Sequence, residues 1–373
     1  MRVLVLTADL PPHVRSGIGR SVGYQVAALA GLGCKTDVAT TVHGASLPSV
    51  RVTQLSTGRF PQALRGSDVL HLHSLRLAEL AWQLKKRDGS CLVYTAHSLL
   101  ERELGYVPEA ASWIRVQERL FQQADHVIFL SEGERRYALK RWPCLSSRSS
   151  VLPHGIPVAP LEPRSFSGPP VILFAGRFCR SKGIDVAVAI MRSLMRRDPS
   201  TTFVLAGGQG DAASERLVSE LVSDYPARCL APGWLSQNAL NDWLRRTTVL
   251  LVPSRYEPFG MIALEAQAKG VPVLGARVDG MADLLGKMSG GATVADHDAE
   301  HWTEVLERML ADRAGLASMS ERGPRYVHAE FGLAAHAERY LRLLRSCVPQ
   351  RDKGTVVPSS ETFWQAEDLT PCG

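Results

Sequence analysis

Short β-branched runs alternate along the chain with longer segments in which apolar positions recur every three or four residues. This alternation is typical of parallel strands joined by helices that cover the sheet. In the first half, the pattern predicts strands near 2–7, 36–41, 68–73, 91–95 and 126–130, and helices near 18–31, 76–87, 110–123 and 132–140. In the second half, it predicts strands near 171–175, 202–206, 249–252 and 272–274, and helices near 183–197, 212–223, 237–245, 259–269, 299–312 and 333–346.

A segment rich in Pro and Gly, VAPLEPRSFSGPP at 158–170, separates the two series and predicts a linker. The 373 residues also exceed one ordinary core. We therefore expect an α/β protein of two doubly wound, Rossmann-like domains, 1–163 and 164–345, facing a central cleft. A polar tail, 346–373, follows, either disordered or packed as a strap. Ligands of such sheets bind beyond the carboxyl ends of the strands.

Composition narrows the class of protein. The chain is 45% hydrophobic and 21% charged, and its apolar runs are too short for a membrane-spanning helix. The first residues, MRVLVLTADLPP, fit a first strand better than a signal peptide. Seven scattered cysteines without a CxxC pair favour reduced thiols, hence a cytoplasmic location, and argue against a zinc site.

The net charge of +6 is placed unevenly. Residues 1–163 hold 19 Lys and Arg against 13 Asp and Glu, whereas 164–373 hold 24 of each. The excess suggests an anionic partner for the first domain, such as a phosphorylated acceptor or an acidic membrane surface. A solvated surface without a partner is the alternative, as it is for the basic segment ERRYALKRW at 134–142, a candidate for peripheral contact with anionic lipid. We expect no nucleic-acid partner, because no basic-aromatic module is evident.

The segment SRYEPFGMIALEA carries the most specific chemistry. Glu257 and Glu265 lie eight positions apart, the first on a loop and the second on a helix that begins near 259–261. The first N–H groups of a helix lack partners and attract anions. One segment thus offers carboxylates for sugar hydroxyls and a ribose diol, and amides for a phosphate.

Other loops that follow predicted strands add candidates. In PPHVRSGIGRS, 11–21, Gly17 and Gly19 allow close approach of a ligand at a helix start, although a tight turn accounts for them equally well. In GRFCRSKG, the cations Arg177 and Lys182 suit a diphosphate. His97 follows the strand near 91–95, where a lone histidine gains functional interest.

Two further loops leave alternatives open. Gly207, in LAGGQG, follows a predicted strand and permits close approach of a ligand, and the absence of any functional role is the equal alternative. Trp234 precedes a helix that Ser236 caps, and its ring suits either the edge of a base-binding site or the core.

We expect no metal site. His71 and His73 share one face of a strand, but the sequence offers no third ligand. Asp296-His297-Asp298 matches a DxD pattern that binds metal-diphosphates in other transferases, yet Asp298 is a natural N-cap for the helix that follows.

Together these segments resemble the family 4 retaining glycosyltransferases, which have the GT-B fold. The resemblance covers about residues 1–345. SRYEPFGMIALEA is similar to the family's EX7E motif, and GRFCRSKG resembles its phosphate-binding loop. SGIG, TAHS, LPHGI and GVPVLGARVDGMADLL also occur in the family's order.

The resemblance implies a role for each matching residue of the second domain. Glu265 would bind the nucleotide ribose, and Glu257 would hold the hydroxyls of the donor sugar. Arg177 and Lys182 would neutralise the diphosphate. Backbone amides for the sugar or phosphate would come from Phe259, Gly260 and Met261.

In the first domain, the resemblance implies that Gly17 approaches the diphosphate and that His97 contacts the sugar. The chain departs from the family's pattern at His154, where Asn is usual, and at Asp279-Gly280, where Gly-Gly is commoner. The first departure leaves the side-chain bonds of its turn open.

The implied activity is that of a retaining hexosyltransferase of bacterial biosynthesis, moving a hexose-type sugar from a nucleoside-diphosphate sugar to a hydroxyl of a small-molecule acceptor. The residues implied in catalysis are Glu257, His97, Arg177 and Lys182. Fixed cations would replace a metal, so we expect no metal and no cofactor besides the donor.

The sequence alone leaves other functions open. The acceptor alternatives are a phospholipid, a sugar phosphate or a polysaccharide. Enzymes of another class on the same fold are a nucleotide-sugar epimerase and a sugar phosphorylase. A non-catalytic binding subunit is the third alternative, against which the intact acidic and basic residues argue.

Overall fold

The computed structural model describes residues 1–11, 17–56, 64, 66–160, 162–286 and 289–348. The chain forms two compact units, one containing Met1–Pro157 with the segment from Gly332 onward, the other containing Val158–Phe331. The division falls six residues before the expected boundary at 163/164. Between it and β8, the described residues form no helix or strand, as expected of a linker.

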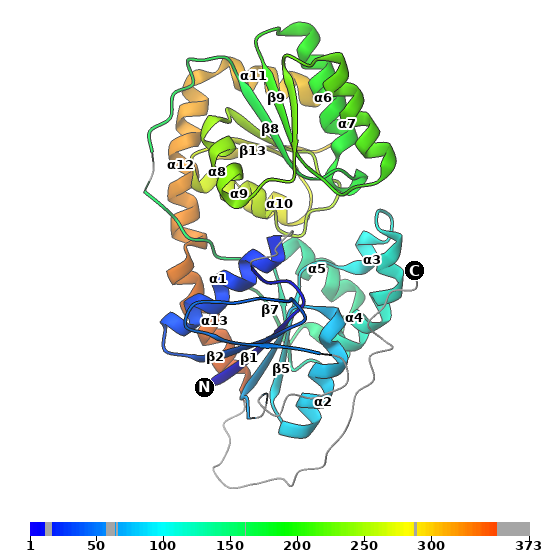
Figure 1. The fold of residues 1–373 in the computed structure, drawn as a ribbon, viewed down its shortest axis with the longest axis vertical. Helices are drawn as coiled ribbons and strands as arrows, with labels where there is room; N and C mark the ends of the chain where they lie inside the picture. The colour runs from blue at the N-terminus through cyan, green and yellow to red at the C-terminus, as the bar shows by residue number, and fades with distance from the viewer. Residues whose placement is uncertain (12–16, 57–63, 65, 161, 287–288, 349–373) are drawn as a thin grey trace. The chain divides into compact units, whose positions relative to one another are not determined.

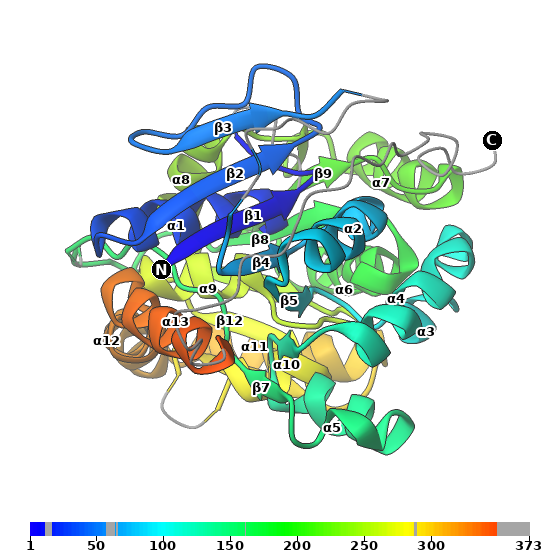
Figure 2. The same cartoon turned by 90° about the horizontal axis from the view of Figure 1, so that it is seen from below.

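The first unit contains a seven-stranded parallel sheet in the order β3-β2-β1-β4-β5-β6-β7 (Figure 2). Its strands are β1 (Arg2–Thr7), β2 (Lys35–Thr40), β3 (Arg51–Gln54), β4 (Val69–Leu72), β5 (Cys91–Ala96), β6 (His126–Phe129) and β7 (Ser149–Val151). Its α-helices are α1 (Gly17–Gly31), α2 (Ala78–Asp88), α3 (Leu100–Glu103), α4 (Ala111–Gln123), α5 (Glu132–Arg141) and α13 (Leu333–Cys347). All strand pairs are parallel, which confirms the predicted doubly wound α/β fold.

Both faces of this sheet are buried, because successive side chains of a strand point to opposite sides. Leu4 and Leu6 of β1 belong to a cluster with α2 and α4. Val3 and Val5 belong to a second cluster, with α1 and α13 (Figure 1).

The C-terminal helix corrects the predicted domain assignment. We expected 333–346 to belong to the second domain, but α13 belongs to the first unit. Its buried residues Tyr340, Leu341 and Leu344 pack with the α1 side of the first sheet. Its apolar stripe therefore has its partner in the N-terminal core, a long-range pairing that chain order does not reveal. The predicted tail beyond 348 lies outside the described residues.

The second unit contains a six-stranded parallel sheet in the order β10-β9-β8-β11-β12-β13. Its strands are β8 (Val171–Arg177), β9 (Thr202–Gly208), β10 (Cys229–Gly233), β11 (Val249–Val252), β12 (Val273–Ala276) and β13 (Gly291–Val294). Its α-helices are α6 (Ile184–Arg197), α7 (Ala212–Asp224), α8 (Gln237–Arg246), α9 (Met261–Ala268), α10 (Asp279–Leu284), α11 (Ala299–Ala311) and α12 (Arg313–Phe331).

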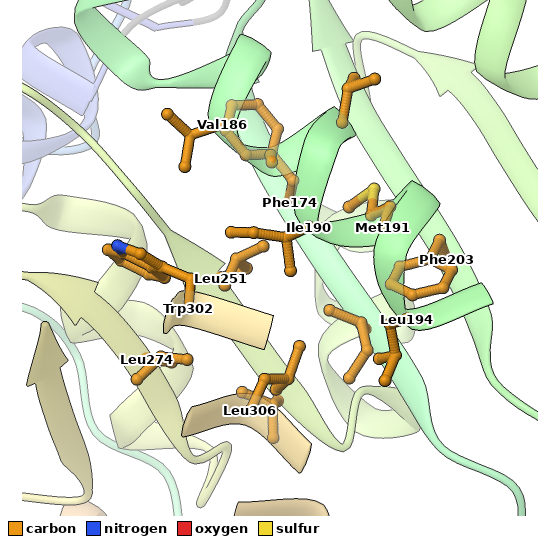
Figure 3. Packing of buried hydrophobic residues seen from close by; sticks show 14 of the residues in the cluster. Phe174, Val186, Ile190, Met191, Leu194, Phe203, Leu251, Leu274, Trp302 and Leu306 are labelled. Carbon is orange, nitrogen blue, oxygen red and sulfur yellow. The ribbon is translucent and has the colours of Figure 1, made fainter. Parts of the chain in front are cut away.

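Figure 3 shows how the α6 side of this sheet is packed. Ile190 and Leu194 of α6 are buried in one cluster with Phe203 of β9 and Leu251 of β11. Trp302 of α11 is fully buried in the same cluster. This core makes the sheet a rigid support for the loops at its strand ends.

The hydrophobic pattern missed several elements for physical reasons. Edge strand β3 has no buried residue, so it lacks an apolar signal. Edge strand β10 contains Pro232 and exposes three of its five residues, and its register with β9 shifts. Helix α12 contains Pro324, which removes a backbone donor and normally argues against a helix interior. The short α3, α10, β7 and β13 were also absent from the prediction.

No helix in the described part of the chain is both long enough and apolar enough to span a membrane.

Candidate functional site

In each sheet, strand order reverses beside the first strand of the unit, between β1 and β4 and between β8 and β11. Ligands of doubly wound sheets bind at such switch points, outside the carboxyl ends of the strands. In the second unit, β8 ends at Arg177 and β11 ends at Val252. Of the predicted site residues, Lys182, Glu257, Phe259 and Gly260 lie between these strand ends and the helices that follow.

The structure brings together two of these residues, Lys182 and Glu257. Lys182 Nζ lies 2.8 Å from Glu257 Oε2, and the two side chains are 24% and 10% exposed. Ser254 Oγ donates to the same carboxylate oxygen at 3.2 Å. A cation and a carboxylate therefore share one site at the switch point and form an ion pair there.

The segment after Glu257 forms the predicted anion-attracting helix start. Helix α9 begins at Met261, and its N-cap Gly260 has φ +98° with no side-chain cap. Phe259 is buried, its ring 5.9 Å from that of Phe331, so only its backbone is suited to a ligand. Glu265 is a buried residue of the same helix.

Arg177 is exposed at the end of β8, and its side chain has no ion pair or hydrogen bond within the described residues. Gly207 has a packing reason for being glycine. Its φ is +152°, and a Cβ there would lie 1.8 Å from the Gly176 carbonyl oxygen on the neighbouring strand. This backbone contact explains the glycine structurally, and its close approach to a ligand stays a prediction.

Trp234 follows β10 and is 39% exposed, so the core alternative for its ring is wrong. The predicted cap behind it is confirmed, because Ser236 Oγ accepts from the Ala239 amide at 3.3 Å. The indole is thus held on the surface at the start of α8.

The remaining site predictions lie in the first unit. Gly17 is the first residue of α1, and Gly19 is buried within it. Residues 12–16 of the predicted loop lie outside the described residues. His97 follows β5, with Nε2 3.0 Å from His73 Nδ1 and its ring stacked on His154 at 5.4 Å.

His97 belongs to a histidine cluster that is uncharged at neutral pH. Burial lowers the pKa of His97 to about 4 and that of His71 to about 3. Burial also holds the pKa of His73 and His154 well below the ordinary value. His97 is therefore suited to hydrogen bonding or packing, and not to acting as a cation.

The side chains considered as metal ligands are engaged in hydrogen bonds within the protein. Both ring nitrogens of His71 have partners, Tyr340 and Thr95. Asp298 caps α11 by accepting from the His301 amide at 2.9 Å, as predicted. Within the residues that the structure describes, no three His, Cys, Asp or Glu side chains are grouped to hold a metal ion.

Some neighbours of the site were not predicted. Ser254 and Arg255 lie in the same loop as Glu257, and the strand-end rule that selected Glu257 would have selected them too. His297 Nε2 lies 3.2 Å from the Ser254 carbonyl oxygen, a contact between loops distant in sequence for which no local signal exists. His154 is buried, with its Nε2 3.4 Å from Ser21 Oγ.

Comparison with known families covers both halves of the chain. Residues 15–159 match the model of Glycosyltransferase Family 4, and residues 160–326 match that of Glycosyl transferases group 1. The chain is 27% identical over 314 residues to a D-inositol 3-phosphate glycosyltransferase of Nocardiopsis dassonvillei, covering 76% of this chain and 71% of that protein. It is 29% identical over 306 residues to the enzyme of that name from Saccharomonospora viridis, covering 75% and 70%.

Solved structures share the two-unit architecture. Sucrose-phosphate synthase from Thermosynechococcus elongatus has a TM-score of 0.78 and 25% identity, with 92% of this chain and 98% of that chain covered. Anabaena HepE, solved in complex with UDP and glucose, has a TM-score of 0.75 and 16% identity, with 93% and 100% covered. The latter likeness concerns the fold alone. From the two family models, these relatives and the paired Rossmann-like units, we conclude that the chain is a glycosyltransferase of the family 4 type with the GT-B fold.

Proposed function

We propose that the protein is a cytoplasmic enzyme that transfers a hexose-type sugar from a nucleoside-diphosphate sugar to a hydroxyl of a small-molecule acceptor, with retention and without a metal or other cofactor. The observation that carries the proposal is the Lys182–Glu257 pair at the β8/β11 switch point. It supplies a cation for the diphosphate and a carboxylate for the sugar within one hydrogen bond of each other.

Charge placement supports the donor assignment. Arg177 and Lys182 follow the same strand, and the uncapped start of α9 adds backbone amides. Negative charge develops on the leaving phosphate during transfer, and fixed donors stabilise it most where they need no reorganisation. Lys182 would move from Glu257 to the diphosphate, leaving Glu257 to accept from sugar hydroxyls. Glu265, one further turn into α9, would accept from the ribose.

The proposed chemical step is a same-face substitution. The acceptor oxygen forms a bond to the anomeric carbon while the bond from that carbon to the diphosphate breaks. The acceptor proton passes to the leaving phosphate oxygen, so no protein base is needed. His97, which burial keeps neutral, would help to position the sugar.

For the acceptor, we favour a small hydroxylated molecule that carries a phosphate. Two observations support this choice: the relatives named D-inositol 3-phosphate glycosyltransferase, and the excess of +6 within residues 1–163. The nucleotide we favour is UDP, because HepE, which shares the fold, was solved with UDP-glucose. A phosphorylated lipid headgroup on an anionic membrane is the alternative acceptor.

The proposal is tested by turnover of UDP-glucose and UDP-N-acetylglucosamine in EDTA with inositol phosphate, inositol, or phosphatidylinositol vesicles. We expect transfer to soluble inositol phosphate, and an axial anomeric linkage in the product by NMR. Transfer only to phosphatidylinositol in vesicles would show that the acceptor is a phosphorylated lipid headgroup and not a small soluble molecule. An inverted product would contradict retention, and consumption of the nucleotide sugar with no acceptor would favour an epimerase.

A further inference from the structure

Two loops of the second unit are tied together by Arg255. Its guanidinium donates to both carboxylate oxygens of Asp185, each at 2.7 Å, and to the Arg180 carbonyl at 2.9 Å. Its backbone amide donates to the Ser181 carbonyl at 2.8 Å. Arg255 therefore makes two hydrogen bonds from the β11 loop to the β8 loop and two to the first turn of α6.

The tied loops are the ones that carry the Lys182–Glu257 pair. Arg255 lies two positions before Glu257, and Asp185 lies three positions after Lys182. The backbones themselves are in contact at Gly183. A Cβ at this residue would lie 1.9 Å from the Pro253 carbonyl oxygen, and its φ is +70°. The distance between the backbones that carry Lys182 and Glu257 is thus set by a direct contact between Gly183 and Pro253, and the Arg255–Asp185 ion pair stabilises that contact.

The Arg255–Asp185 ion pair has the geometry of a strong interaction. The Arg255 side chain is 18% exposed, and the Asp185 side chain is 38% exposed. Partial burial raises the pKa of Asp185, but the hydrogen bonds and charge of Arg255 outweigh it, so the pKa lies below the ordinary value. The carboxylate therefore stays ionised at neutral pH. A planar guanidinium binds a carboxylate through two parallel bonds, which a lysine cannot reproduce.

In the proposed function, the two loops must keep their relative positions while the donor binds. Lys182 and Glu257 pair with each other in the structure, but a donor would engage them separately, Lys182 at the diphosphate and Glu257 at the sugar. When their mutual contact breaks, other interactions must keep the two backbones at their distance. Arg255 and Asp185 provide such interactions without using Lys182 or Glu257.

We propose that Arg255 and Asp185 are positioning residues. They keep the backbone of the loop that carries Lys182 at a fixed distance from the loop that carries Glu257, when these two side chains give up their mutual contact to bind the donor. This inference rests on the proposed function and adds two residues to its site. Neither residue is assigned contact with the substrate.

The test uses two variants. Arg255→Lys keeps the positive charge but cannot form the two parallel hydrogen bonds to Asp185, and Asp185→Asn keeps the shape of the side chain but loses its charge. Asp224→Asn is the matched control, because it breaks the Arg192–Asp224 ion pair elsewhere in the same unit. Each full-length variant is measured for Tm, for calorimetric affinity toward whichever of UDP, GDP, dTDP and ADP the wild type binds most tightly, and for kcat and KM with the corresponding nucleotide sugar.

We expect all three variants to lower Tm by similar amounts. The two Arg255–Asp185 variants should also lose on the order of 10- to 100-fold in kcat/KM, as misplaced binding groups do, while the control keeps the wild-type value. Adding Lys182→Ala should lower kcat/KM by a smaller factor in the Arg255→Lys protein than in the wild type, because Lys182 is already misplaced in Arg255→Lys.

Clear results would overturn the inference. If kcat/KM of both Arg255–Asp185 variants equals that of the control, the positioning role is wrong while the proposed function stands. If the wild type binds none of the four nucleotides, the proposed function fails and the inference fails with it.

Discussion

Lys182 Nζ donates to Glu257 Oε2 at 2.8 Å, which joins the loop after β8 to the loop after β11. The two residues are 75 positions apart in sequence, yet the parallel order β8-β11 places their strands next to each other. Each group neutralises the other in a site that is only partly open to water. A ligand that supplies both an anion and hydroxyl donors can replace both halves of this contact.

Replacement of Lys182 by alanine should lower kcat by about 10²–10³, the range typical for losing one preorganised charge-stabilising contact. It also leaves Glu257 facing the anionic donor without its counter-ion. Lys182→Arg should retain part of the activity, since it keeps the charge. Steady-state kinetics with a nucleotide sugar would measure both, and unchanged kcat in Lys182→Ala would remove Lys182 from the mechanism.

Arg177→Ala should separate activity from folding. Within the described residues the Arg177 side chain is exposed and unpaired, so its loss should change the free energy of unfolding by less than about 0.5 kcal/mol. We expect kcat/KM to fall by about 10²-fold or more. Arg196→Ala, another exposed arginine of this unit, is the control and should leave both quantities unchanged. A stability loss in Arg177→Ala as large as its activity loss would speak against the assignment.

Gly183→Ala should be strongly destabilising. A Cβ at this position meets the Pro253 carbonyl oxygen at 1.9 Å, and φ is +70°, a region that L side chains rarely adopt. We expect a loss of at least about 2 kcal/mol in the free energy of unfolding, measured from urea denaturation. Gly168→Ala, where a Cβ would meet nothing within 4 Å, should be neutral. Equal urea midpoints for the two variants would contradict the described contact.

Stability should fall as the pH is lowered from 7 to 5. His336 is fully buried, and burial together with the charge of Arg339 lowers its pKa from 6.5 to about 4. Because the unfolded chain binds the proton first, the stabilisation is complete above pH 6.5 and is lost as the pH falls toward 4. The expected loss is about 2 kcal/mol at pH 5 from this residue.

The pH effect is measured by urea denaturation at pH 7 and pH 5 for the wild type and His336→Asn. The variant should be less stable at pH 7 and less sensitive to pH, since asparagine does not titrate. An identical pH dependence in both proteins would show that His336 does not titrate as described.

The sequence predicts those features that depend on local pattern. Continuous hydrophobic runs, such as those of β1 and β8, predict buried parallel strands, because helices cover both faces of such a sheet. The positions of Lys182 and Glu257 follow from the rule that ligands bind at carboxyl ends of strands. Their direct contact and the Arg255–Asp185 ion pair were not predicted, because both depend on which strands are neighbours.

The failures have identifiable causes. Helix α12 contains Pro324 and Gly323, which disfavour a helix by intrinsic propensity, and its packing against α9 overrides them. The apolar stripe of α13 was visible in the sequence, but nothing local shows that it returns to the first unit. His71 and His73 were expected on one face of a strand, but His97 and His154 are distant from them in sequence, so the clustering of all four is a consequence of the fold.

The central claim is that Lys182 and its neighbours bind the diphosphate of a nucleotide without a metal. The most direct measurement is calorimetric titration of wild-type protein and Lys182→Ala with UDP, GDP, dTDP and ADP in the presence of EDTA. We predict that one nucleotide binds the wild type clearly more tightly than the others and at least 10-fold more weakly to Lys182→Ala, a loss of about 1.4 kcal/mol. A folded wild-type protein that binds none of the four, or a Lys182→Ala variant that binds as tightly as the wild type, would contradict the claim.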